Sequence, residues 1–341
     1  MAVRDALKHE LPSAWENDMI GQLESREPIL IAIAAHVIGY RRIPGAKQIV
    51  RRLQGLPEPA LLECLWALGR LGDDIACSPI TACLEHPANS IRSAGALALL
   101  RLGDTLPVRV CEQDADHQEW LILQLALAGG PSALQRVRRL VERTPTATGF
   151  LALGLLGDPD IVPLLLTGLA NPELAPRAAL ALQVITAASL SEEVFIPEET
   201  DADELFDEEK SDWKQGKNPV RADGKPFGVA VTRLSQKLDE WKSWWAQNES
   251  LFYLGYRYRS GQLYSPAGLI ENLNSEWSPL FFRQLVYEEL VIRYGLKHPF
   301  ETDMPVTQQV QALNSISEWA AQSGDHSVKA PGISRCGRSK L

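Results

Sequence analysis

The sequence has few of the side chains, and none of the short motifs, that mark catalytic or metal-binding sites. Its six histidines are scattered, and it has no Gly-x-Ser-x-Gly elbow, no glycine-rich phosphate loop and no CxxC pair. His117 lies among carboxylates in the segment 114–119, but Asp116 is placed to cap the following helix, which needs no metal. We therefore expect no catalytic residue, no cofactor, no metal site and no enzymatic activity.

Long hydrophobic runs are also missing. No stretch approaches the ~18 consecutive apolar residues of a membrane helix, and residues 1–20 contain four acidic side chains but no apolar signal-peptide core. We expect a cytoplasmic protein without a membrane span. Its few cysteines have no paired spacing and are predicted to be reduced and structural: Cys64, Cys77, Cys83, Cys111 and Cys336.

The negative charge of the chain is concentrated in one segment. The formal net charge is −9, and residues 191–212 hold 11 of the 43 acidic residues against one of the 34 basic ones. The remainder is nearly balanced, which disfavours a nucleic-acid partner. Arginine clusters at 41–52 and 136–143 could bind phosphates, but acidic neighbours dilute them. We favour solvated helix faces or contact with an acidic protein, with two candidate residues in the second cluster: Arg136 and Arg139.

One phrase recurs along the first half of the chain. Ala-Leu-Gly-Arg-Leu-Gly-Asp at 67–73 returns as Ala-Leu-Leu-Arg-Leu-Gly-Asp at 98–104 and as Leu-Gly-Leu-Leu-Gly-Asp at 153–158. Degenerate copies lie at 124–130 and 35–40. The marker glycines are separated by 33, 31, 26 and 28 residues: Gly39, Gly72, Gly103, Gly129 and Gly157. Self-similarity at this period predicts a solenoid.

Each copy of the phrase predicts an antiparallel pair of helices. An apolar first helix ends in Leu-Gly-Asp, where the glycine can adopt the left-handed conformation that terminates a helix. A short link then leads into a second helix, such as 75–84 or 161–169. The pattern resembles HEAT-like repeats and predicts an all-α chain with a HEAT-like α-solenoid over residues 1–190. We expect the second helices of successive repeats to form a concave surface that holds a partner.

Beyond the repeats we expect three further regions. Residues 191–228 combine acidic runs with Gly, Lys and Pro, and are interpreted as an acidic, mobile linker or insertion. This segment is either a solvated loop or a docking segment with three apolar anchors: Phe195, Leu205 and Phe206. A C-terminal helical module is expected at 229–322 and a disordered basic tail at 323–341.

An aromatic cluster lies near the start of the C-terminal module. Trp241, Trp244 and Trp245 are spaced as on one face of a helix, and a connection rich in Tyr and Arg follows. Such a face is more often core than binding site, yet Trp, Tyr and Arg dominate interface energies. We assign most of the face to the core and name four candidate partner contacts: Trp244, Tyr256, Arg257 and Arg259.

Three segments of the C-terminal third resemble an uncharacterised bacterial family. They are Glu-Trp-Lys-Ser-Trp-Trp at 240–245, Leu-Phe-Tyr-Leu-Gly-Tyr-Arg-Tyr at 251–258 with Gly-Gln at 261–262, and Phe-Arg-Gln-Leu-Val-Tyr-Glu-Glu-Leu at 282–290. Members of that family carry HEAT-like repeats and are often encoded beside type VI secretion genes for spike, PAAR-tip and cargo proteins. The resemblance implies an accessory or adaptor role and carries over no catalytic residue.

These observations favour a non-catalytic protein-binding scaffold or adaptor. Its partner would be another protein, and the resemblance implies an accessory or chaperone-like factor for a type VI secretion spike, tip or effector. One alternative is an immunity protein that binds and neutralises a toxin. Another is a HEAT-fold enzyme acting on nucleic acid or a tetrapyrrole, which predicts that the purified protein binds DNA or a bilin.

Overall fold

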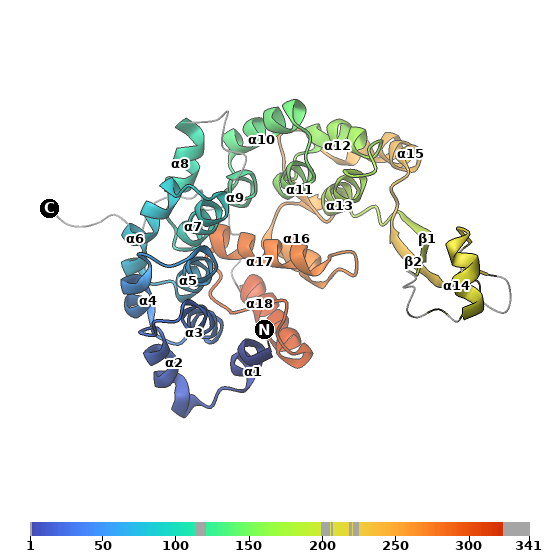
Figure 1. The fold of residues 1–341 in the computed structure, drawn as a ribbon. Helices are drawn as coiled ribbons and strands as arrows, with labels where there is room; N and C mark the ends of the chain where they lie inside the picture. The colour runs from blue at the N-terminus through green and yellow to red at the C-terminus, as the bar shows by residue number, and fades with distance from the viewer. Residues whose placement is uncertain are drawn as a thin grey trace.

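The helices of the first half of the chain form a curved double row (Figure 1). The computed structural model describes residues 2–113, 121–198, 205, 207–217, 220 and 225–322. Two helices lead into the row: α1 (Ala2–Glu10) and α2 (Glu16–Gln22). The first helix of each pair lies on the inside of the curve: α3 (Pro28–Arg41), α5 (Glu58–Leu71), α7 (Asn89–Arg101), α9 (Ile122–Ala128), α11 (Ala147–Leu156) and α13 (Ala175–Thr186). The second helices form the outer row: α4 (Ala46–Arg52), α6 (Cys77–Thr81), α8 (Leu106–Gln113), α10 (Pro131–Arg143) and α12 (Val162–Gly168). The predicted HEAT-like α-solenoid is confirmed.

The Leu-Gly-Asp phrase ends one helix and starts the next. Gly72 after α5 and Gly157 after α11 have φ of 70° and 71°, the left-handed conformation that closes a helix. The side chains of Asp73 and Asp158 then accept hydrogen bonds from the amides two residues further on, at 3.1 and 2.9 Å. This pairing of a stop signal with a start signal explains why the phrase recurs with each helix pair.

The earliest copy of the phrase is shifted relative to the prediction. Gly39 lies inside α3, and the left-handed residue that ends this helix is Arg42, with φ of 59°. A Cβ on Gly39 would lie 2.6 Å from the Cα of Ala67 on α5. Gly39 is therefore a glycine because the neighbouring inner helix touches its backbone, and it does not terminate a helix.

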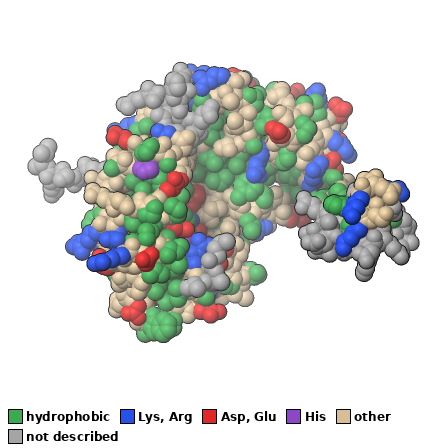
Figure 2. Space-filling view, viewed as in Figure 1, with side chains coloured by type: hydrophobic (Ala, Val, Ile, Leu, Met, Phe, Trp, Pro, Cys, Tyr) green, Lys and Arg blue, Asp and Glu red, His purple; other side chains and the backbone are tan. Residues whose placement is uncertain are grey.

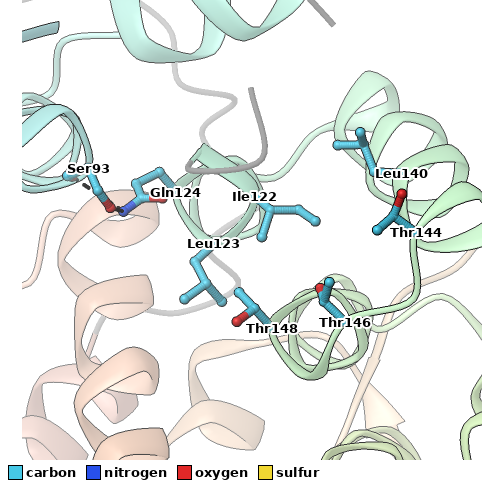
Figure 3. A pocket seen from close by; sticks show the side chains of 8 residues that line it. All are labelled: Ser93, Ile122, Leu123, Gln124, Leu140, Thr144, Thr146 and Thr148. Atoms are coloured by element: carbon cyan, nitrogen blue, oxygen red, sulfur yellow. Dashed lines mark hydrogen bonds between the residues drawn. The ribbon is translucent and has the colours of Figure 1, made fainter. Parts of the chain in front are cut away.

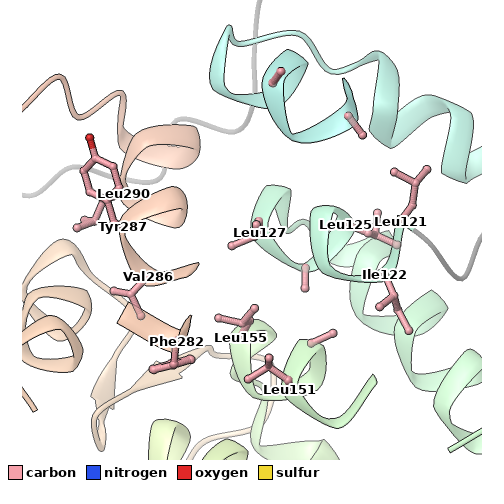
Figure 4. Close-up of a cluster of buried hydrophobic side chains, with 14 of the residues drawn as sticks. Leu121, Ile122, Leu125, Leu127, Leu151, Leu155, Phe282, Val286, Tyr287 and Leu290 are labelled. Atoms are coloured by element: carbon pink, nitrogen blue, oxygen red, sulfur yellow. The ribbon is translucent and has the colours of Figure 1, made fainter. Parts of the chain in front are cut away.

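The C-terminal helices fill the inside of the curve (Figure 1): α16 (Pro266–Asn274), α17 (Leu280–Tyr294) and α18 (Val306–Gln322). The central one, α17, contacts α7 and α9. Figure 4 shows Phe282 and Val286 of α17 in the same buried cluster as Leu127 of α9 and Leu155 of α11. The solenoid and the C-terminal helices therefore share one hydrophobic core.

Two strands form an arm that projects from the end of the solenoid (Figure 1): β1 (Ser191–Pro197) and β2 (Gly228–Leu234). They pair antiparallel, from Ser191 opposite Leu234 to Pro197 opposite Gly228. Residues 191–197 and Gly228 are therefore in ordered strands and are not a mobile linker, whereas the alternative of an insertion stays open. Val-Phe-Ile at 194–196 favours a strand. The acidic residues around these three positions instead suggested a mobile segment.

The rest of the arm and the return to the body are short elements. The helix α14 (Asp207–Lys214) lies at the far end of the arm (Figure 1). After the arm, α15 (Leu238–Asn248) contacts α12. A two-stranded ribbon of β3 (Tyr258–Arg259) and β4 (Gln262–Leu263) then contacts α13 through β3 and leads into α16.

The cysteines of the described residues are not all reduced. Cys64 and Cys83 are free thiols, but Cys77 at the start of α6 is disulfide-bonded, so the prediction of reduced cysteines is wrong at this position. Sequence spacing does not reveal which thiols meet in space, because a disulfide depends on the distance between the folded Cβ atoms. Among the helices that the structure describes, none combines the length and apolar character needed to cross a bilayer.

Candidate partner-binding site

The inside of the solenoid is covered by the chain's own C-terminal helices. The first helix of each pair lines the concave face, and α17 lies across it in contact with α7 and α9 (Figure 1). The inner helix α11 is apolar on every side, and all its residues from Gly149 to Leu156 are buried. A helix that is apolar on every side is expected to be buried on every side. The expectation of a concave surface made by second helices and open to a partner is therefore wrong.

A buried carboxylate on α17 gathers three arginines. Glu289 has no exposed surface, and its Oε2 lies 2.8 Å from Nη2 of Arg259. Its Oε1 lies 3.2 Å from Nε of Arg293 and 3.5 Å from Nη2 of Arg257. The hydroxyl of Tyr264 donates to the same oxygen at 2.7 Å. One negative charge therefore faces three positive charges inside the protein.

The same three arginines also donate to the ends of two inner helices. Arg259 donates to the carbonyl of Leu155 at 2.7 Å, and Arg257 to the carbonyls of Leu155 and Leu156 at 3.0 and 2.5 Å. Arg293 donates to two carbonyls at the end of α9, both at 2.8 Å. The last carbonyls of a helix lack partners within it and carry partial negative charge. Two helix C-termini thus offset the excess positive charge of the cluster.

Arg257 and Arg259 accordingly bind the chain itself. The prediction of Arg259 as a partner contact is wrong, whereas the side chain of Arg257 is 25% exposed and its role as a contact stays a prediction. Arg259 is fully buried, and the guanidinium of Arg257 is held between α11 and the ring of Tyr264 at 4.0 Å. Burial lowers the pKa of Arg257 to about 10, and repulsion from Arg293 adds to the shift. The side chain still carries its charge at neutral pH.

Two marker glycines make room for this cluster. A Cβ on Gly129, which follows α9, would clash with the guanidinium of Arg293. A Cβ on Gly157 would clash with the carbonyl oxygen of Tyr258, whose amide donates to the carbonyl of Gly157 at 2.7 Å. These two repeat glycines therefore follow an inner helix and, because they lack a Cβ, also allow the C-terminal segment to contact the end of that helix.

A second charged cluster joins α17 to the N-terminal half of the solenoid. Arg70 of α5 donates to both oxygens of Glu301, at 2.6 and 2.9 Å, and lies 3.4 Å from Glu288 of α17. Arg101 of α7 donates to Glu288, and Arg42 pairs with Glu301 at 3.4 Å. Burial alone would raise the pKa of Glu288, but the charges of Arg101 and Arg70 outweigh it and hold the pKa below its ordinary value.

These clusters were not predicted, although the sequence contains two signals of them. Glu288 and Glu289 stand together within an otherwise apolar segment, and arginine occupies the same place in the repeat phrase at 70 and 101. A charge in a buried segment requires a partner. The pairing itself could not be predicted, because Arg101 and Glu288 are 187 residues apart.

The segment Leu251–Tyr256, here called the aromatic loop, exposes large apolar side chains. The exposed fractions are 64% for Leu251, 68% for Tyr253, 70% for Leu254 and 58% for Tyr256. No charged residue lies within the loop. The loop therefore offers a concentrated apolar surface to another molecule.

The aromatic loop has a fixed base. The ring of Phe252 is buried and packs against Trp245 at 5.3 Å, Trp244 at 6.3 Å and Tyr258 at 4.9 Å. The hydroxyl of Tyr258 accepts a hydrogen bond from the amide of Tyr253 at 2.9 Å. The exposed side chains of the loop are therefore presented from an ordered support.

The predicted contact residues fall into three places. Trp244 is half-buried against Phe252 at the base of the aromatic loop, and Tyr256 is exposed on the loop itself. Phe195 lies on the arm, and Arg136 and Arg139 lie on α10 (Figure 1). The predicted contacts therefore do not form one continuous surface.

The predicted anchors of the acidic segment do not form one surface. Phe195 on β1 is 46% exposed, next to Ile196 at 51%, which pairs with Val229 at 61%. Leu205 is buried, and Phe206 lies outside the described residues. The strands therefore contribute exposed apolar side chains to the arm, as do Trp213 on α14 and Val220.

The arginines of α10 lie in the outer row among acidic side chains. Arg139 is exposed and its Nε donates to the carbonyl of Gln135 at 3.3 Å, while Arg136 is half-buried and has a partner. Arg138 between them pairs with two acidic residues, at 2.9 and 2.6 Å. Figure 2 shows basic and acidic side chains interspersed over the viewed face. This pattern gives no strongly positive field.

A cavity of about 360 Å³ opens among α7, α9, α10 and α11 (Figure 3). Its lining is apolar and threonine-rich, and Gln124 donates to Oγ of Ser93 at 2.5 Å. None of the described lining residues is an acid, a base or a thiol. The described lining therefore offers hydroxyl groups without an acidic or basic side chain beside them. The described residues also contain no group of three His, Cys, Asp or Glu side chains that could hold a metal.

Comparison with known proteins gives a likeness of fold. No family model and no curated protein matches the chain. Among solved structures, the complex of CpcE and CpcF of phycocyanin lyase from Nostoc sp. PCC7120 is similar, with 21% identity and a TM-score of 0.39. The match covers 52% of this chain and 79% of that chain. A likeness at this level gives no information on function.

Proposed function

We propose that this chain is a protein-binding scaffold or adaptor whose partner docks on the aromatic loop. The observation that carries the proposal is the exposure of Leu251, Tyr253, Leu254 and Tyr256 on one uncharged loop. Contiguous exposed apolar side chains mark interaction sites, and tyrosine is enriched among the residues that dominate interface energies. The partner expected from this chemistry is a folded protein with an uncharged apolar cleft.

The supported base of the loop favours tight binding. Full burial of a large apolar side chain contributes about 1.5–3 kcal/mol, so four such side chains can supply several kcal/mol. Association is weakened by the ordering of flexible segments. Because Phe252 is packed and Tyr258 holds the amide of Tyr253, less ordering is needed here than in a free loop.

We further propose that the partner is a spike, tip or effector of a type VI secretion system, for which this chain is an accessory or chaperone-like factor. The support is the resemblance of segments 240–245 and 251–262 to the family described above. The second segment contains the aromatic loop itself. Toxin neutralisation would be a special case of the same docking.

The test is affinity capture of the tagged full-length chain from its native cells, combined with cross-linking. We expect a stoichiometric protein to be recovered and cross-linked near the loop. Replacement Leu254→Asp should reduce recovery about tenfold or more, as loss of a central apolar contact does. The matched control is Val306→Asp on α18, where the side chain is 75% exposed, and this variant should capture the partner as the parent does.

Two results would contradict the proposed function. One is the absence of any stoichiometric partner from native cells, and the other is equal recovery by the Leu254→Asp and Val306→Asp chains. The identity of the captured protein tests the secretion hypothesis separately. If that protein is a toxin, co-expression distinguishes rescue of growth, expected of an immunity protein, from stabilisation of cargo, expected of an adaptor.

A further inference from the structure

A small cavity lies where α1, the end of α3 and the connection to α18 meet. Its volume is about 230 Å³. Its described lining contains no acidic side chain, although the chain has a net charge of −9. The lining instead carries hydrogen-bond donors from three elements: Lys8, His9, Tyr40, Arg41, Arg42 and Gln308.

Arg42 brings excess positive charge to this cavity. It belongs to the cluster in which three arginines, Arg42, Arg70 and Arg101, face the two carboxylates of Glu288 and Glu301. Burial lowers the pKa of Arg42, and repulsion from Arg101 and Arg70 adds to the shift. An anion bound in the cavity would favour the charged form of Arg42 and so offset both the burial and the repulsion.

Arg41 and Lys8 add further donors. Arg41 lies 3.7 Å from Glu16, which is too long for a hydrogen bond, and its Nε is buried without a partner. Lys8 is 4% exposed and donates to Asp303 at 2.5 Å. Its ammonium group has three hydrogens and a guanidinium has five. Lys8 also donates to Asp5 at 3.5 Å, so one of its three hydrogens remains for a ligand, and Arg41 has a buried N–H without a partner.

Tyr40 contributes a hydroxyl that stays protonated. Burial raises its pKa, and the carboxylates of Asp303 and Glu301 raise it further. Its ring is met edge-on by His9 at 5.4 Å and lies 5.1 Å from the ammonium group of Lys8. The hydroxyl, 3.5 Å from Nδ1 of His9, is therefore a protonated group that lies near both the basic side chains of the lining and the carboxylates of Asp303 and Glu301.

We propose that this cavity binds the phosphate group of a small phosphorylated compound. Donors reach it from α1, α3 and α18, and a tetrahedral oxyanion can accept hydrogen bonds from several directions at once. A water molecule takes about 30 Å³, so a cavity of about 230 Å³ holds a phosphate and a short organic part. The site shares no residue with the aromatic loop and does not depend on the proposed function.

The test is calorimetric titration of the full-length chain at low ionic strength with two probes, inorganic phosphate and glycerol 3-phosphate. The two probes distinguish a site for the free ion from a site for a phosphate monoester. We expect both to bind, and the monoester more tightly. Replacement Arg41→Gln or Tyr40→Phe should weaken binding about tenfold, as loss of one hydrogen bond to a charged group does. Arg51→Gln, on the exposed side of α4, is the matched control and should bind as the parent does.

Several outcomes would overturn the proposal. Failure of both probes to bind at millimolar concentration would do so, and so would equal weakening by Arg41→Gln and Arg51→Gln, which would indicate non-specific attraction of anions. The Tyr40→Phe chain keeps the ring and its packing, so it tests the hydroxyl even if the Arg41→Gln chain is poorly folded. Unchanged binding by Tyr40→Phe with a native melting curve would remove Tyr40 from the site and contradict the proposed geometry.

Discussion

Replacement of Glu289 by glutamine tests whether charge holds the C-terminal helices inside the solenoid. The substitution keeps the size of the side chain but removes the carboxylate that faces Arg257, Arg259 and Arg293. Breaking a buried ion pair costs about 3–5 kcal/mol, because the remaining charge is left without its partner. The helix carbonyls that bind the same arginines remain. We therefore expect a loss near the lower limit, about 3 kcal/mol.

A loss of this size is a large share of the ~5–15 kcal/mol by which domains are stable. Urea denaturation followed by circular dichroism measures it, and hydrogen exchange at residues 258–263 shows whether the C-terminal segment is released first. The control is Glu142→Gln, which breaks the exposed pair with Arg138 on α10, where such pairs contribute about 0–1 kcal/mol. Equal losses in the two variants would refute the role assigned to Glu289.

Two further predictions concern the repeat glycines and pH. Replacement Gly157→Ala should destabilise the chain more than Gly72→Ala. Both glycines are left-handed, a conformation that costs alanine about 1–2 kcal/mol, but an added Cβ would clash with Tyr258 at position 157 and meet nothing at position 72. Equal denaturation midpoints of the two variants would contradict this prediction. Acid should weaken the fold through Glu288. Arg101 and Arg70 hold the pKa of Glu288 below the ordinary 4.5. The stability that Glu288 contributes is therefore complete above pH 4.5 and is lost as the pH falls through the lower pKa of the folded state. Urea denaturation midpoints measured across this range should show the loss, and the Glu288→Gln variant should show a smaller dependence on pH.

The repeat architecture could be predicted because its signals are local. A left-handed glycine and a capping aspartate act within a few residues, so Gly72 with Asp73 and Gly157 with Asp158 are visible as a phrase. The same recurring sequence wrongly predicts that Gly39 ends α3, because Arg42 is the residue that adopts the left-handed conformation there. A non-glycine residue at such a position leaves no mark in the sequence.

The occupant of the concave face could not be predicted by the same route. The contacts that hold it join residues far apart in the chain, such as Arg259 and Leu155, which are 104 residues apart. Arg257 and Arg259 have the composition of an interface, and they do form one, but with the chain's own helices. Sequence composition marks a contact residue without telling whether its partner is internal or external. Tyr256, beside them in sequence, is 58% exposed, and that difference becomes visible in the folded chain.

The filled groove bears directly on where a partner could act. In an open solenoid the concave face is the binding surface, but here it is part of the core, so binding is left to elements outside it. The aromatic loop is joined without a break to Arg257, Tyr258 and Arg259, which bind the end of α11. A partner docked on Tyr256 therefore rests on residues clamped to the C-terminus of an inner helix. The same clamp that closes the groove gives the loop a rigid support, which is why variants of Glu289 and Gly157 should weaken partner binding as well as stability.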